Sequence, residues 1–300
     1  FFMVMQDGSS STFRKSIDYG VTWTTYSNGW YVLGAGEGIE GVILTTCPSN
    51  PSKVYAYIAG YGGTLNGYVG VFKSTDSGEN WTNTNPSNQI GGTYVIPTHT
   101  NLMANNGTTG FNQGYYDMAI IANPLNDNQL IAGGTSWFKS DDGGATWYAL
   151  GGYIGILSWC HPDMQSISAV GSDLFISTDG GINYSNDFAA TIEARMDGVS
   201  GADMWGFDSG WNVDILVGGR YHNGNMTYHE SFTPGDYYRM GGAESPTGYV
   251  NPGPGNRTYF SDIGGYKINE GFGNNVVGFS VGAYPNESYA YYANSEMAFH

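Results

Sequence analysis

Four aspartates of this chain stand in nearly the same short pattern, and carboxylates that recur at one spacing could ligate a metal ion or act as acid and base. The pattern is Ser-x-Asp-x-Gly-x-x-Trp, and a relaxed fourth copy ends in Tyr. Its members are Ser16, Asp18, Gly20 and Trp23; Ser74, Asp76, Gly78 and Trp81; Ser140, Asp142, Gly144 and Trp147; and Ser177, Asp179, Gly181 and Tyr184.

The residue types of the pattern favour a turn over a metal or catalytic cluster. The Asp carboxylate can accept hydrogen bonds from backbone N–H groups just ahead of it, which closes an Asx-type turn. The Gly can take the positive φ of a tight hairpin. The Trp can bury its ring against a sheet and anchor the turn. We therefore expect all four copies to be structural, with the Trp rings buried and no metal bound.

Strands must carry these turns, and the chain repeats one phrase of apolar or alternating runs around them. The runs lie at 41–46, 53–59 and 68–73 before the second copy, at 117–122, 129–133 and 137–139 before the third, and at 155–160 and 173–176 before the fourth. One four-stranded antiparallel blade results when these strands are joined in order by an Asn-Pro-type turn, a tight turn and a Ser-x-Asp turn. Repetition of such a unit indicates a radial array.

The fold class that this phrase predicts is all-β, a β-propeller built from four-stranded antiparallel blades. Glycine at 47 residues and aromatic residues at 15% suit many tight turns joined by aromatic-rich strands. The blades are clearest in 1–190 and diverge in 191–300. The chain holds strands for roughly five to six blades, so we expect 1–300 to be an incomplete propeller that belongs to a longer chain.

The pattern resembles the Asp-box (BNR) repeat of sialidases, of xyloglucan-cleaving hydrolases and of sortilin-type receptors. The resemblance covers most of 1–190 and is nearest to the bacterial secreted surface-protein type. It implies a β-propeller whose Asp-box turns lie on the outer rim of separate blades, away from the central pocket. It also implies a secreted or cell-surface location.

The charge of the chain excludes several classes of partner. Ten Lys and Arg face 26 Asp and Glu, and the formal net charge is -16. Such a surface repels phosphate backbones and anionic bilayers, so we expect neither nucleic acid nor membrane insertion. The Gly-rich loop at 34–41 lacks the Lys and the following helix of a phosphate cradle, and no cofactor is expected. Cys47 and Cys160 could pair or remain buried thiols.

A catalytic alternative rests on Asp262. The segment Ser-Asp-Ile-Gly-Gly-Tyr at 261–266 resembles the Gly-Asp-Ile-x-Gly-Phe segment that carries a catalytic Asp in the xyloglucan-cleaving family, with Ser in place of the first Gly. Glycoside hydrolysis needs a second carboxylate across the scissile bond. By loop position Glu37, Glu40 and Asp117 are the nearest candidates for that partner.

Two other sites are weaker. The run from His161 to Gln165 resembles a His-x-Asp-x-His segment of bacterial Asp-box proteins, but Gln165 replaces the second His, which favours a structural hydrogen-bonding role over a metal site. A sialidase would need an arginine clamp for the sugar carboxylate, and the five arginines stand in none of the expected contexts.

The abundance of aromatic residues indicates binding. Exposed Trp and Tyr rings can stack on the apolar faces of sugars while Asn, Asp and Gln bond the hydroxyls, and the loops at 91–114 and 206–211 mix these types, although most rings should fill the core between blades. We expect an extracellular binding or interaction platform for a glycan or a partner protein. The alternatives are a glycoside hydrolase of the xyloglucan-cleaving kind and a structural module of a larger extracellular assembly.

Overall fold

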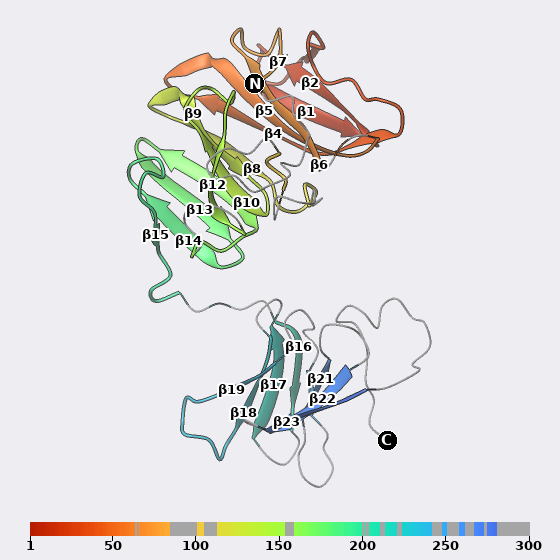
Figure 1. The fold of residues 1–300 in the computed structure, drawn as a ribbon, viewed down its shortest axis with the longest axis vertical. Coiled ribbons are helices and arrows are strands. Elements are labelled where there is room, and N and C mark those ends of the chain that lie inside the picture. Colours follow the sequence, from red (N-terminus) through yellow and green to blue (C-terminus); the bar gives the residue numbers. More distant parts are fainter. Residues whose placement is uncertain are drawn as a thin grey trace. The chain divides into compact units, whose positions relative to one another are not determined.

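The computed structural model of the chain contains strands and turns and, among the residues it describes, no helix (Figure 1). It describes residues 1–63, 65, 67–84, 101–104, 113–153, 159–199, 201, 204–210, 214–220, 224–241, 248–250, 258–261, 267–272 and 275–280. The chain divides into two compact units, Phe1–Asp197 and Gly198–His300. Unit 1 contains the Ser-x-Asp patterns and is described first.

Unit 1 holds one three-stranded and three four-stranded antiparallel sheets, each a meander of consecutive strands. The strands of the first two sheets are β1 (Phe2–Asp7), β2 (Ser10–Lys15), β3 (Thr24–Thr25), and β4 (Glu37–Cys47), β5 (Asn50–Gly62), β6 (Gly67–Ser74), β7 (Thr82–Asn83). Those of the next two are β8 (Ala119–Asn123), β9 (Asn126–Gly133), β10 (Ser136–Ser140), β11 (Tyr148–Gly152), and β12 (Met164–Val170), β13 (Asp173–Thr178), β14 (Gly181–Ser185), β15 (Glu193–Ala194).

Successive sheets of unit 1 pack through their leading strands. β1 contacts β4, β4 contacts β8, and β8 contacts β12. Each meander then runs outward from this inner row of strands, which is how the blades of a propeller are arranged. The predicted all-β fold with four-stranded antiparallel blades is confirmed.

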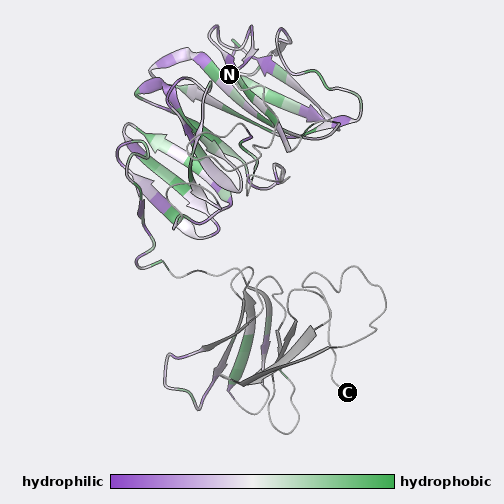
Figure 2. Cartoon of the chain, viewed as in Figure 1, coloured by the Kyte–Doolittle hydropathy of each residue, from purple (hydrophilic) through white to green (hydrophobic). Residues whose placement is uncertain are grey.

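The core of unit 1 lies in the junctions between sheets, and β5 shows how the sequence builds it. Alternate residues of a strand point to opposite faces, so Val54 and Ile58 enter the junction with the first sheet while Tyr55 and Tyr57 enter the junction with the third. All four side chains are fully buried. Figure 2 shows hydrophobic residues within the strands of unit 1 and hydrophilic residues at many of the turns. Residues of neighbouring sheets that belong to one core cluster are Phe13 and Phe72, Tyr55 and Leu130, and Trp137 and Leu174.

Unit 2 contains two further four-stranded antiparallel meanders. Their strands are β16 (Met204–Ser209), β17 (Ile215–Arg220), β18 (Gly224–His229), β19 (Tyr238–Gly241), β20 (Gly248–Val250), β21 (Thr258–Ser261), β22 (Lys267–Phe272) and β23 (Asn275–Ser280). β20 contacts β16 and β17, with Val217 and Val250 buried. The expectation that 1–300 forms one incomplete propeller stays a prediction.

Candidate functional site

The first three Ser-x-Asp patterns form the same hydrogen-bonded turn. In the third turn Ser140 Oγ donates to Asp142 Oδ1 at 2.8 Å and accepts the backbone N–H of Gly144 at 2.9 Å. Asp142 Oδ1 also accepts the backbone N–H of Thr146, and the Trp147 indole donates to the Gly144 carbonyl. The first and second turns repeat these bonds with their own residues.

The backbone of these turns explains the glycine of the pattern. Gly20 and Gly78 have φ of 88° and 87°, and Gly144 has φ of 90°, a conformation that side chains disfavour. At Gly78 a Cβ would also lie 2.3 Å from the Phe13 ring. Glycine is therefore required there both by φ and by the close packing of the preceding sheet.

The Trp residues of the second and third turns pack against the sheet before their own. Trp81 lies 4.8 Å from Phe13, centroid to centroid, and is 4% exposed; Trp147 is 1% exposed. Trp23 differs from the expectation because it is only partly buried. Within unit 1 the three-stranded sheet that carries Trp23 is the first, so no earlier sheet covers the ring.

The fourth pattern does not form this turn. Ser177 lies in β13 and Tyr184 in β14, and the two strands join through a tight hairpin in which Thr178 pairs with Gly181. Asp179 Oδ1 accepts a hydrogen bond from the Gln165 side chain instead of closing its own turn. The pattern marks the link between the second and third strands of its sheet, whereas the other turns precede the last strand.

The equivalent turn of the fourth sheet lies eight residues later, between β14 and β15. Ser185 Oγ donates to Asp187 Oδ1 and accepts the Ala189 N–H, both at 2.8 Å, and Asp187 Oδ1 accepts the Thr191 N–H at 2.8 Å. Phe188 and Ala189 take the positive φ that Tyr19 and Gly20 or Ser77 and Gly78 take elsewhere. The signal that could have found this turn is Ser-x-Asp-x-x-x-Thr, a spacing that the first and third turns share.

The shifted turn also corrects the expected strands of this sheet. The first strand is β12, at Met164–Val170, and follows the His-Pro turn instead of preceding it. Residues 155–158 of the run predicted at 155–160 lie outside the described part of the chain.

The carboxylates of the turns accept hydrogen bonds from residues of their own loops. Hydrogen bonds from the Thr22 side chain and backbone lower the pKa of Asp18 to about 2, and the Asn80 side chain and backbone do the same for Asp76. Each group is therefore ionised and saturated by local donors. No group of three potential metal ligands is brought together among the residues that the structure describes.

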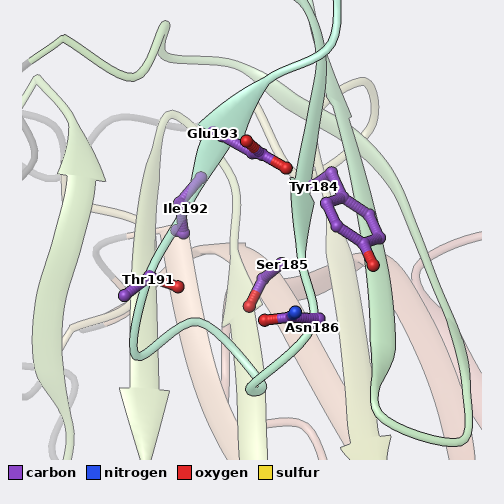
Figure 3. Close-up of a pocket in the computed structure, with 6 residues that line it drawn as sticks. All are labelled: Tyr184, Ser185, Asn186, Thr191, Ile192 and Glu193. Carbon is purple, nitrogen blue, oxygen red and sulfur yellow. The ribbon is translucent and has the colours of Figure 1, made fainter.

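A cavity of about 340 Å³ lies beside the fourth turn (Figure 3). It is lined by Tyr184, Ser185, Asn186, Thr191, Ile192 and Glu193. The Ser185 and Thr191 hydroxyls are bonded to Asp187, and Glu193 pairs with Arg195. Most polar side chains that line this cavity are thus already bonded to residues of the turn or next to it.

The opposite end of the sheets carries exposed aromatic side chains. This end, called the aromatic end below, is where β4, β8 and β12 begin and where the second strand of each four-stranded sheet of unit 1 turns into the third. The exposed fractions are 46% for Tyr61, 71% for Tyr115, 52% for Tyr116, 60% for Tyr153 and 52% for Trp159. Gly38 positions one of these rings, because a Cβ there would lie 2.5 Å from Tyr61 Cζ.

The aromatic ends of neighbouring sheets are aligned by direct contacts. Met164 at the start of β12 donates its N–H to the Gly134 carbonyl, in the turn after β9, at 2.8 Å. Gly41 of β4 lies against Gly114, just ahead of β8, since a Cβ on Gly41 would lie 2.5 Å from that carbonyl oxygen. The five aromatic residues therefore share one end of unit 1.

The same end of the sheets holds a cluster of acidic side chains that sequence reasoning did not assemble. Gln165 Nε2 donates to Asp117 Oδ1 at 2.5 Å and to Asp179 Oδ1 at 3.0 Å. Asp117 is fully buried, and its Oδ2 receives no donor from the described residues. Burial, followed by the nearby charges of Asp163 and Asp179, raises the pKa of Asp117 to about 8. A bond between the Asp117 and Asp163 carboxyls requires one of them to hold a proton, and the raised pKa assigns it to Asp117.

The other candidate residues take local roles or are not described. Glu37 accepts bonds from the Tyr31 hydroxyl and the Gly34 N–H within its own loop. Burial raises the pKa of Glu40, whose carboxylate also bonds the Gly114 backbone. His161 is exposed, with Nδ1 3.0 Å from the Pro162 carbonyl oxygen. Asp262 lies outside the described residues, as do 91–100, 105–112 and 211 of the two predicted aromatic loops. Residues 206–209 of the second predicted loop lie in strand β16 instead. Cys47 and Cys160 are both buried free thiols.

No model of a known protein family matches the chain, and no curated protein matches it. Among solved structures the chain is similar to a GH74 enzyme of Niastella koreensis, with 15% identity, TM-score 0.39, and 91% of this chain and 42% of that chain covered. It is similar to YCF48 bound to D1 peptide, with 12% identity, TM-score 0.32, and coverage of 93% and 70%. A nidogen/laminin complex gives 10% identity, TM-score 0.38, and coverage of 90% and 88%. The chain thus spans less than half of the GH74 protein.

Proposed function

We propose that the chain is an extracellular binding platform that holds an extended glycan on the aromatic end of unit 1. The observation that carries the proposal is the grouping of five exposed aromatic side chains at this end. Large exposed rings cost solvation free energy, and their gathering on one surface is typical of a binding site. Pyranose rings present flat C–H faces that suit such side chains.

The acidic cluster supports binding more than hydrolysis. Asp117 is protonated but fully buried, so it cannot touch a bound chain. Its role is to hold the start of β8 against β12 and thereby fix the loops that carry the rings. The formal charge of -16 favours a neutral or basic ligand over an acidic polysaccharide.

Glycoside hydrolysis through Asp262 is the alternative, and a structural module of a larger assembly is the second alternative. One experiment distinguishes these two alternatives from the binding platform. The full chain and its Asp262→Asn variant are tested for binding to, and release of reducing sugar from, neutral β-glucans, xyloglucan and an acidic polysaccharide. We expect both proteins to bind a neutral polysaccharide without releasing reducing sugar. Release that the substitution abolishes would establish the hydrolase, and absence of binding to every polysaccharide would contradict the glycan platform.

The location and the partner classes follow from the same proposal. A secreted or surface protein would meet extracellular glycans directly. In the described ranges nothing forms a helix with the length and apolarity that crossing a bilayer requires. The competing hypothesis is a protein partner that binds at the same end. Binding of a neutral polysaccharide would support the glycan over the protein.

A further inference from the structure

A second cavity, of about 380 Å³, lies between β2, the segment 26–33 and the start of β4. It is lined by Ser10, Ser11, Thr12, Tyr26, Ser27, Trp30, Tyr31, Val32, Leu33 and Ile39. None of these side chains is charged at neutral pH, so the lining offers no counter-charge to a charged ligand. The lining therefore selects a neutral ligand, and the volume is within the range of small-molecule sites.

One wall of this cavity is rigid and aromatic. Trp30 is 6% exposed, its ring lies 5.0 Å from that of Trp81 and 5.7 Å from that of Phe13, and its Nε1 donates to the Ser11 carbonyl at 3.2 Å. Tyr31 is fixed by the bond from its hydroxyl to Glu37. Rings held in this way lose little conformational entropy when a ligand binds.

The other wall offers hydroxyl groups. Ser11 Oγ accepts the Trp30 indole N–H at 3.3 Å, which leaves its own proton to donate. Thr12 and Ser27 add two further hydroxyl groups to the lining. A ligand with several hydroxyls of its own can satisfy all three groups, because a hydroxyl both donates and accepts.

We propose that this cavity, the Trp30 pocket, binds one ring of a neutral sugar. The combination of the partly buried Tyr26 and Tyr31 rings with three hydroxyl groups matches a pyranose, which has apolar faces and a polar rim. A proline-rich peptide would also use the aromatic wall, but it has few groups for the three hydroxyls. The inference rests on the proposed glycan binding and places a specific subsite in it.

The Trp30 pocket adjoins the aromatic end. Ile39, which lines the pocket near the start of β4, donates its N–H to the Ser9 carbonyl in the β1–β2 turn at 2.7 Å. Gln6 Nε2 donates to the Ile39 carbonyl at 3.0 Å. The pocket thus lies beside the strand from which the aromatic end of the second sheet begins, within reach of the end of a glycan bound there.

The test is a saturation-transfer NMR titration of the full chain with methyl glycosides of glucose, galactose, mannose and xylose. The variant Thr12→Val with Ser27→Ala removes two hydroxyls at nearly constant shape, and Thr25→Val, an exposed position on β3, is the matched control. We expect at least one glycoside to bind the wild type and the control equally and the double variant at least fivefold more weakly.

Three outcomes would overturn the pocket. They are the absence of glycoside binding to the wild type, equal binding by the double variant, and displacement of the glycoside by an oligoproline peptide that itself binds more weakly to the double variant. Polysaccharide binding measured on the same samples separates the two proposals. If the polymer binds while no glycoside enters the pocket, the subsite fails and the platform stands; if neither binds, both fail.

Discussion

Gln165 and Asp117 join the starts of two neighbouring inner strands by a hydrogen bond of 2.5 Å between Nε2 and Oδ1. The same amide nitrogen reaches Asp179 in the β13–β14 hairpin. One uncharged side chain thus bridges two carboxyl groups across the junction of the third and fourth sheets. The remaining oxygen of Asp117 is buried and receives no hydrogen bond from the described residues.

This arrangement predicts a pH-dependent stability. Because burial and neighbouring charges raise the pKa of Asp117 in the folded state above its value near 4 in the unfolded chain, its stabilising contribution is complete below about pH 4 and is lost as the pH rises through about 8. We expect the Asp117→Asn variant, whose amide can donate without titrating, to gain on the order of 2 kcal/mol relative to wild type between pH 5 and pH 9. Urea unfolding at both values measures this.

The control for the pH experiment is Asp7→Asn, which makes the same change of charge at an exposed position. Its free energy of unfolding should follow the wild type at both pH values. A constant difference between wild type and Asp117→Asn across the range would show that Asp117 is ionised throughout.

The fourth turn makes a second prediction. Asp187→Ala leaves the N–H groups of the turn without their acceptor and should reduce the free energy of unfolding by about 1–3 kcal/mol, as should Asp142→Ala in the third turn. Asp7→Ala, at an exposed position, should change it by less than about 0.5 kcal/mol. Denaturant unfolding of the three variants checks this, and an Asp187→Ala variant as stable as wild type would remove the fourth turn from the series.

Two glycines at equivalent positions separate backbone strain from packing. Gly20 and Gly78 have nearly the same positive φ, but a Cβ at Gly20 meets only the Trp23 ring at 3.7 Å, whereas one at Gly78 would clash with the Phe13 ring. Gly20→Ala should therefore cost about 1–2 kcal/mol from φ alone. Gly78→Ala should cost at least about 1 kcal/mol more because of overpacking. Equal losses of thermal stability would mean that the Phe13 ring moves freely aside.

The sequence predicts the fold of unit 1 well because its signals are local. Gly and Asp determine the turn, and alternating apolar residues determine strands such as β5 and β6. Neither signal depends on residues far away in the chain. The fourth turn was not recognised because Ala189 and Ile192 replace the Gly and the Trp of the pattern, while an Asp-Gly-Gly hairpin nearby imitates it. Tertiary packing holds Phe188 and Ala189 at positive φ, and local propensity does not reveal that.

The candidate site was less predictable because it depends on which strand starts meet. Asp117 and Gln165 are 48 positions apart, and only the contact of β8 with β12 brings them together. The exposed rings of Tyr115 and Trp159 likewise look like core residues in sequence. Their exposure follows from their place in the links between sheets.

The measurement that tests the central claim most directly is the affinity of the full chain for a neutral polysaccharide, compared with that of two variants of the aromatic end and one at the opposite end. Tyr115→Ala and Trp159→Ala each remove an exposed ring, and Tyr19→Asn removes a ring that is 90% exposed in the first Ser-x-Asp turn. By isothermal titration we expect each of the first two to bind about tenfold more weakly, a loss of about 1.4 kcal/mol, and the third to bind as wild type does. Wild-type affinity in Tyr115→Ala and Trp159→Ala, or an equal loss in Tyr19→Asn, would contradict the assignment of binding to the aromatic end.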